Sequence, residues 1–79
     1  MKVKILGTSC ARCNTLEQKV RKLIESHQLQ AEVQKISDIS EMISYGIVRT
    51  PGLVINEQLK SNGVIPKDKQ ILQWLKEAQ

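Results

Sequence analysis

Two cysteines separated by two residues, Cys10 and Cys13, carry the strongest chemical signal in this sequence. A cysteine thiolate attacks disulfides and also binds soft metal ions, so a C-x-x-C pair is typical of both kinds of site. With one histidine, His27, the chain has too few ligands for a four-coordinate structural zinc site of its own. In a reducing compartment such a pair is more often catalytic or metal-binding than structural.

The elements expected around the pair favour redox chemistry. Residues 2–6 alternate as in a short strand, Gly7 interrupts them, and apolar residues then recur at helical spacing from about 11 to 27, with Ser9 or Cys10 as the cap. The start of a helix carries partial positive charge and unpaired N–H groups, which favour a thiolate at Cys10. We therefore expect Cys10 to attack a substrate disulfide.

The spacing also predicts a role for the second cysteine. Cys13 follows Cys10 by about one helical turn, near enough to attack a mixed disulfide formed there. It shares an apolar stripe with Leu16 and Val20, so we expect it to be the more buried sulfur. Arg12, between the cysteines, adds positive charge near the thiolates.

The rest of the chain reads as alternating short elements of an α/β fold. We expect a strand at 31–36, a short helix from 38 to 46, a buried strand at 53–55, a hairpin partner at 58–61 and a last helix at 66–77. Asp38 resembles a helix cap, Gly46 suits the helix end, and Pro66 suits a first helical position. Because a helix separates the first two strands, they should run parallel with a right-handed crossover, whereas the hairpin should be antiparallel.

Length and composition bound the class of protein. The 79 residues suit one domain, 1–79, and the 41% hydrophobic and 25% charged content suits a soluble globular chain. Lysines and arginines are dispersed despite a net charge of +4, so we expect no nucleic-acid binding. The first residues lack the apolar run of a signal peptide and no stretch is long enough for a membrane span, so we expect a cytoplasmic monomer.

Three segments of the sequence and the last helix together resemble the thioredoxin/glutaredoxin superfamily, and most of all its small redox-active disulfide proteins. They are GTSCARC at 7–13, YGIVRTP at 45–51 and LVIN at 53–56, with the last helix. The resemblance implies a thioredoxin-like fold, a four-stranded mixed sheet in the order β-α-β-α-β-β-α with three helices. It also implies that Pro51 is cis and packs beside the cysteines, where the backbone next to Thr50 binds an extended substrate.

The functional expectation is a thiol–disulfide oxidoreductase that exchanges disulfides with a protein substrate. Cys10 and Cys13 are the expected catalytic residues, while Ala11, Arg12, Thr50 and Pro51 are expected to contact substrate. No cofactor or metal is expected. The electron donor is expected to be a thioredoxin reductase-like protein or another thiol.

The sequence departs from classical thioredoxins in ways that bear on mechanism. Ser9 replaces a tryptophan before Cys10, and Lys4 lies where the proton-accepting carboxylate of those proteins should fall. Lys4 then either favours a thiolate by its charge or extends its stem into solvent. Only Gly63 remains of the double-glycine signature of glutaredoxins, which leaves glutathione use open.

A second reading assigns the same pair of cysteines to a soft-metal carrier. The segment from Gly7 to Cys13 also resembles the start of small copper chaperones, whose paired thiolates suit Cu(I). Those domains have a methionine before the first cysteine and end in a strand, whereas this chain lacks that methionine and is expected to end in a helix.

Overall fold

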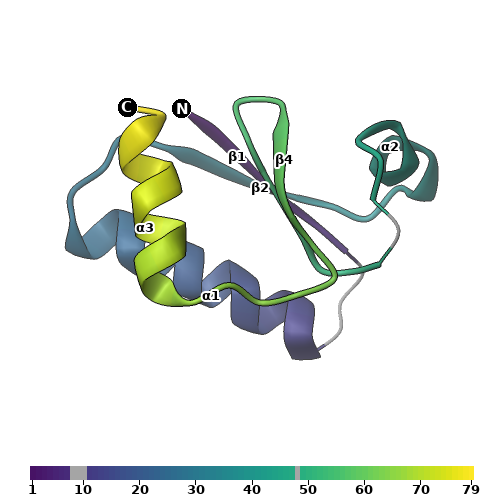
Figure 1. Cartoon of the computed structure of the whole chain (residues 1–79), viewed down its shortest axis with the longest axis horizontal. Coiled ribbons are helices and arrows are strands. Elements are labelled where there is room, and N and C mark those ends of the chain that lie inside the picture. The colour runs from purple at the N-terminus through teal and green to yellow at the C-terminus, as the bar shows by residue number, and fades with distance from the viewer. Residues whose placement is uncertain (8–10, 48) are drawn as a thin grey trace.

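The computed structural model describes residues 1–7, 11–47 and 49–79 (Figure 1). Along the chain these residues form four strands and three helices in the predicted order β-α-β-α-β-β-α. The elements are β1 (Lys2–Leu6), α1 (Ala11–Ser26), β2 (Glu32–Ile36), α2 (Ile39–Ser44), β3 (Gly52–Ile55), β4 (Gln58–Asn62) and α3 (Asp68–Glu77). The thioredoxin-like α/β fold predicted from the sequence is thereby confirmed.

The four strands form one mixed sheet in the order β2-β1-β3-β4. β1 and β2 run parallel, as predicted for strands joined through a helix, and Leu6 pairs with Ile36 at their shared end. β3 runs antiparallel to both β1 and β4. Because Leu6 pairs with Gly52, the end of β1 lies beside the start of β3, where Pro51 enters the sheet. The topology thus brings residues 7 and 51 to the same sheet end.

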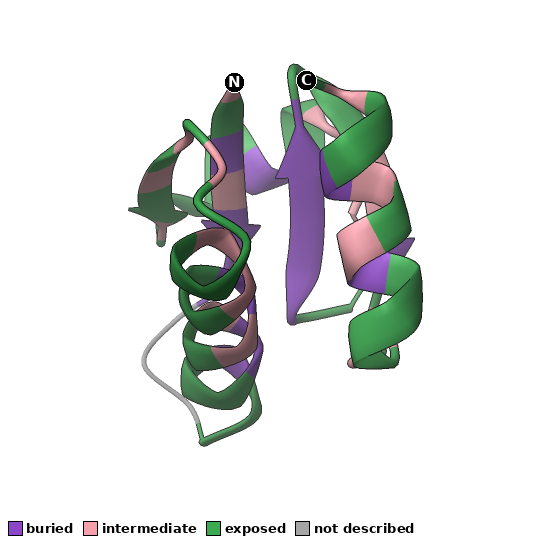
Figure 2. Ribbon diagram, turned by 90° about the vertical axis from the view of Figure 1, so that its left-hand side faces the viewer, coloured by how far each residue is buried: buried purple, intermediate pink, exposed green. Residues whose placement is uncertain are grey.

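The alternation of side chains along the strands divides the core between the two faces of the sheet. The larger cluster packs α1 and α3 against one face, and its fully buried members are Val3, Ile5, Leu16, Val20, Leu53, Ile55, Ile71 and Leu75. The smaller cluster packs α2 against the other face through Leu6, Met42 and Val54. β3 is buried along its whole length, and Figure 2 shows it in purple between α1 and α3. A continuous apolar run is typical of such a strand.

Three local predictions about turns and helix ends are confirmed. Asn56 and Glu57 both have positive φ, 49° and 68°, so they form the two-residue turn between β3 and β4. Asp38 caps α2, since its Oδ1 accepts a hydrogen bond from the Glu41 N–H at 2.9 Å. Gly46 follows the helix with a φ of 84°, the left-handed conformation common after a helix end.

The last helix corrects the sequence prediction at its start. α3 begins at Asp68, not at Pro66, because Lys67 remains extended with a ψ of 152°. The Pro66 carbonyl instead accepts a hydrogen bond from Lys19 Nζ at 3.1 Å, and the same ammonium group pairs with Asp68 at 3.2 Å. The side chain from α1 therefore anchors the approach to the helix. Among the described residues, no helix combines the length and apolar character needed to cross a membrane.

Ser61 offers a test of polar burial in β4. Its hydroxyl is buried and has no hydrogen-bond partner within the described part of the chain. A buried hydroxyl without a partner carries a desolvation penalty. We predict that Ser61→Ala leaves the free energy of unfolding unchanged or raises it by up to about 1 kcal/mol in urea titration. A loss of stability would show that the hydroxyl is bonded.

Candidate functional site

Cys13 lies in the first turn of α1, as the sequence predicts. Its relative exposure is 0%, so the sulfur is enclosed on the apolar side of the helix together with Leu16 and Val20. The first turn of α1 contains no acidic residue, so no carboxylate there offsets the partial positive charge of the helix start. Cys10 and its neighbours Thr8 and Ser9 lie outside the described residues, and so does the predicted cap.

Gly7 joins Cys13 to the segment before β3. A Cβ atom built on Gly7 would overlap Cys13 Sγ and would lie 3.5 Å from Thr50 Cβ. The buried sulfur therefore leaves no room for a side chain at residue 7, directly after β1, and Thr50 lies close to the same position. The Gly7 N–H donates to the Ile36 carbonyl at 2.9 Å, which fixes this residue to the end of β2.

Gly63 connects the start of α1 to Pro51. The Gly63 N–H donates to the Pro51 carbonyl at 2.9 Å, and the Gly63 carbonyl accepts from Arg12 Nη2, also at 2.9 Å. The Thr50–Pro51 peptide bond is cis. Pro51 is fully buried, whereas Thr50 and Arg12 are exposed. One residue thus ties Arg12 to the segment that Pro51 starts.

The structure brings most of the expected site residues together. Cys13 and Thr50 meet at Gly7, while Arg12 and Pro51 meet at Gly63. Ala11 is exposed as the first residue of α1. The sequence signalled neither contact made by the two glycines, since glycine at the end of a strand or hairpin is ordinary turn chemistry. The feature of the sequence that could have indicated these contacts is the position of each glycine directly after a strand.

Lys4 takes part in a different cluster. Its Nζ donates to Tyr45 Oη at 2.5 Å and pairs with Glu57 Oε1 at 3.0 Å, while the Tyr45 hydroxyl donates to Glu57 Oε2 at 2.9 Å. Lys4 is 16% exposed and Glu57 is 62% exposed, so the lysine stem is enclosed and the carboxylate faces solvent. The cluster joins β1, the end of α2 and the β3–β4 turn. Lys4 therefore does not extend freely into solvent, and its charge is paired with the carboxylate of Glu57.

This network shifts two pKa values in opposite directions. The hydrogen bond with Tyr45, and then that with Glu57, raises the pKa of Lys4 well above its usual 10.5. The hydrogen bond from Lys4, and then that from Tyr45, lowers the pKa of Glu57 from its usual 4.5. Both side chains therefore stay charged over a wider pH range in the folded protein.

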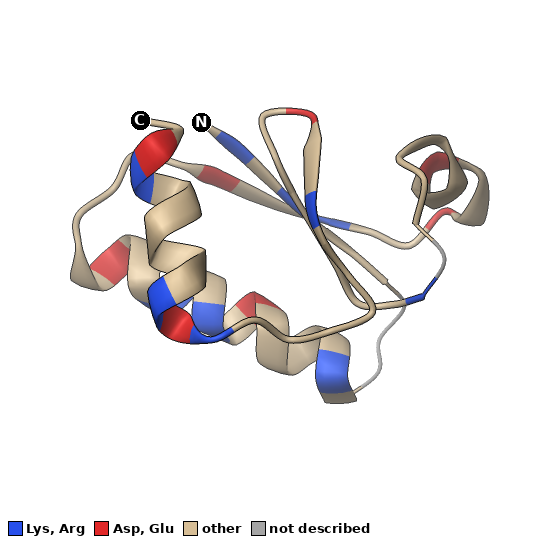
Figure 3. Cartoon of the chain, in the orientation of Figure 1, with Lys and Arg blue, Asp and Glu red and all other residues tan. Residues whose placement is uncertain are grey.

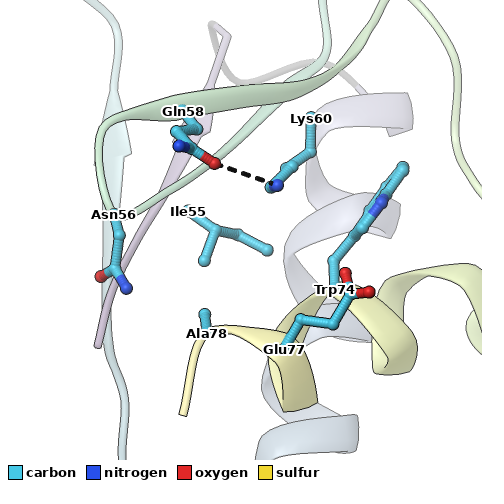
Figure 4. Close-up of a pocket in the computed structure, with 7 residues that line it drawn as sticks. All are labelled: Ile55, Asn56, Gln58, Lys60, Trp74, Glu77 and Ala78. Atoms are coloured by element: carbon cyan, nitrogen blue, oxygen red, sulfur yellow. Dashed lines mark hydrogen bonds between the residues drawn. The ribbon is translucent and has the colours of Figure 1, made fainter.

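A hollow lies at the end of the sheet opposite to Cys13 (Figure 4). It is lined by Ile55, Asn56, Gln58, Lys60, Trp74, Glu77 and Ala78. Ile55 pairs with Val3 near the start of β1, whereas the cysteine end adjoins Leu6. This hollow is thus remote from Cys13. Within residues 1–7, 11–47 and 49–79, no three histidine, cysteine or acidic side chains gather as metal ligands.

Comparison with known proteins gives consistent matches. Residues 1–76 match a family model described as a thioredoxin domain. A thioredoxin of Methanothermobacter thermautotrophicus is 32% identical over 71 residues, which cover 90% of this chain and 92% of that protein. A thioredoxin of Methanocaldococcus jannaschii is 32% identical over 74 residues, covering 94% of this chain and 85% of that protein.

The contact between Gly7 and Cys13 predicts a cost for any side chain at residue 7. In Gly7→Ala the new methyl group must displace the buried sulfur, and forced repacking of this kind costs about 1–3 kcal/mol. We expect that loss in the free energy of unfolding, measured in urea. Gly46→Ala is the matched control, because both glycines have positive φ, 157° at Gly7 and 84° at Gly46, but a Cβ on Gly46 would meet no atom within 4 Å. Gly7→Ala should therefore lose more stability than Gly46→Ala. Equal losses in the two variants would contradict the predicted overlap.

The Lys4–Glu57 pair predicts a pH-dependent contribution to stability. Because the pKa of Glu57 is lowered by folding, its contribution is present above pH 4.5 and is lost as the pH falls through the folded value. The contribution of Lys4 is present below pH 10.5 and is lost as the pH rises through its raised value. Glu57→Gln should therefore be less stable than the wild type at pH 7, with a smaller difference at pH 3. Urea midpoints at both pH values test this, and a larger difference at pH 3 would refute it.

Proposed function

The chain belongs to the thioredoxin family, and from that membership we propose a small thiol–disulfide oxidoreductase that works through Cys10 and Cys13. The observation that carries the proposal is the position of Cys13. Its sulfur is buried in the first turn of a helix, against Gly7, which lies near the exposed Thr50 next to Pro51. A sulfur in that position suits the resolving half of a dithiol pair, while its partner meets the substrate.

The proposed reaction has two thiolate attacks. The Cys10 thiolate attacks one sulfur of the substrate disulfide, forms a mixed disulfide and releases the first substrate thiolate. The Cys13 thiolate then attacks the Cys10 sulfur, closes the Cys10–Cys13 disulfide and releases the second substrate thiolate. Two electrons pass to the substrate, whose thiolates take protons from water. A thioredoxin reductase-like protein or another thiol returns two electrons to the pair.

Two features support a reactive thiolate at this end of the molecule. The N-terminus of α1 carries unpaired N–H groups and partial positive charge, and Cys10 directly precedes Ala11, the first residue of this helix, in the sequence. Arg12 adds a full positive charge, and its hydrogen bond to Gly63 keeps the side chain near the Pro51 segment. Both favour the ionised sulfur that attacks a disulfide.

The substrate is proposed to lie across the exposed residues of this end. Ala11, Arg12 and Thr50 are exposed around the buried Cys13 and Pro51, so an extended segment can approach from solvent. The protein substrate would then present its disulfide to Cys10. We place this reaction in the cytoplasm, in a monomer of one domain that needs no cofactor.

Substitution of each cysteine separates the two attacks. We predict that Cys10→Ser reduces insulin disulfides no faster than the uncatalysed reaction, because the attacking sulfur is lost. Cys13→Ser should instead accumulate a mixed disulfide with substrate, detectable by mass spectrometry, because resolution is lost. Gln18→Ser, on the exposed side of α1, is the control and should retain wild-type activity. Full activity in Cys10→Ser would refute the proposal.

The alternative to the proposed oxidoreductase is a copper carrier that binds Cu(I) through the same two thiols. Mild oxidation of the purified protein should link Cys10 to Cys13 within one chain. Two thiols that stay free under oxidation, together with one Cu(I) per chain in equilibrium dialysis, would indicate a metal carrier. The helix α3 as last described element does not match the terminal strand of small copper chaperones.

A further inference from the structure

Two arginines converge on Gly63 beside the proposed substrate surface. Arg12 reaches it from α1 and donates to its carbonyl at 2.9 Å. Arg49 packs its stem on the other side, since a Cβ built on Gly63 would lie 2.7 Å from Arg49 Cβ and 3.4 Å from its Cδ. The backbone N–H of Arg49 also donates a hydrogen bond to Asn62 Oδ1 at 3.1 Å, which fixes the position of this residue. Both arginines are therefore held next to the segment that begins at Thr50.

Neither arginine has a carboxylate partner within the described part of the chain. The ion pairs there join Lys4 to Glu57, Lys19 to Asp68, Arg21 to Glu17 and Lys35 to Glu17. Residues 8–10 and 48 include no acidic side chain either. Basic and acidic residues are interspersed over much of the molecule (Figure 3), yet these two exposed guanidinium groups have no acidic counterpart. They present a positive charge to solvent beside the site.

An apolar hollow adjoins this charge. It has a volume of about 160 Å³ and is lined by Ile39, Met42, Ile43, Ile47, Arg49 and Thr50. Of the three large apolar side chains of α2, only Met42 is buried in the core, while Ile39 and Ile43 are 67% and 63% exposed. Large apolar side chains grouped on a surface are typical of interaction sites. Figure 1 shows α2 at the same end of the molecule as the start of α1.

Neither Asp38, the cap of α2, nor Glu41 forms an ion pair with Arg49 within the described part of the chain. Asp38 Oδ1 is engaged with the Glu41 N–H as the helix cap. Glu41 is two residues from Ile39 and two from Ile43, and at 100° per residue it points to another side of the helix than they do. The hollow thus combines isoleucine side chains with one charged residue, Arg49, next to Thr50.

We propose that this surface selects disulfide substrates with an apolar residue and an acidic residue beside the reacting cysteine. This inference rests on the proposed function and names its substrate class, a polypeptide segment. The apolar side chain enters the hollow formed by Ile39, Ile43 and Ile47, and the carboxylate pairs with Arg49. Arg–carboxylate pairs are charge-assisted and directional, so Arg49 is a specificity-determining residue rather than a reacting group.

The charge arm of the test uses disulfide-linked peptide dimers that differ at one residue next to cysteine, Glu, Gln or Lys, with Leu on the other side. We expect kcat/KM to fall in the order Glu, Gln, Lys, with Glu over Lys by about three- to tenfold at low salt, as for exposed ion pairs. In Arg49→Gln this ratio should fall toward one. Comparing ratios within a variant removes any change in thiol reactivity.

Lys76→Gln is the matched control for the charge arm. It removes one positive charge from the last turn of α3 and should keep the wild-type ratio. Equal rates for the three peptides, or an unchanged ratio in Arg49→Gln, would overturn the inference while leaving the proposed function standing. If the protein reduces none of the peptides and does not reduce the small uncharged disulfide bis(2-hydroxyethyl) disulfide either, the proposed function is refuted, and the inference with it.

The apolar arm replaces Leu by Ser in the Glu peptide. The wild type should prefer Leu by about three- to tenfold, which is the effect expected for partial burial of an aliphatic side chain. Ile43→Ser should lose that preference but keep the preference for Glu over Lys. Because Ile43 is exposed, its replacement removes no core contact. If Ile43→Ser instead abolishes a dimer seen by sedimentation and leaves the Leu preference intact, the hollow binds a second copy of the chain and the inference is wrong.

Discussion

The site depends on the lack of space between Gly7 and the buried sulfur of Cys13. A sulfur enclosed by α1 can lie against the end of β1 only where the strand carries no side chain, and residue 7 is glycine. A Cβ at the same residue would also reach van der Waals distance of Thr50 Cβ, at 3.5 Å, so the first helix and the Pro51 segment both lie near the end of the first strand. Protein interiors are packed as densely as organic crystals, so such a contact tolerates little change.

Much of the fold follows from local patterns in the sequence. The helical spacing that predicts α1 places Cys13, Leu16 and Val20 on the buried side, and they are fully buried. The Asp38 cap and the two-residue turn at Asn56 also follow from local chemistry, because each satisfies the backbone within a few residues. Patterns of this range are readable because both partners lie close together in the chain.

The errors and omissions concern contacts between distant segments. Pro66 does not begin α3, and its carbonyl instead accepts a hydrogen bond from a lysine of α1 that no local pattern indicates. Lys4 pairs with Tyr45 and Glu57, which lie 41 and 53 positions away in the chain. From the sequence alone, Lys4 could therefore be recognised only as a charged residue on a strand, without its partners. Periodicity also states which side chains can share a face, but not whether another surface covers them, and Ile43 of α2 remains exposed.

The pairing of Lys4 bears on how a thiolate is stabilised in this chain. Its ammonium group is neutralised locally by Glu57, so its field at the cysteine end of the sheet is that of an ion pair, which falls off faster than that of a single charge. The unpaired positive charges at that end are the start of α1 and the two arginines held at Gly63. A fold of 79 residues has little interior for a separate charged proton acceptor, since a buried charge needs partners of its own. Charge at the surface, on Arg12 and Arg49, avoids that desolvation cost, and in the proposed function it would act on both the Cys10 thiolate and the substrate.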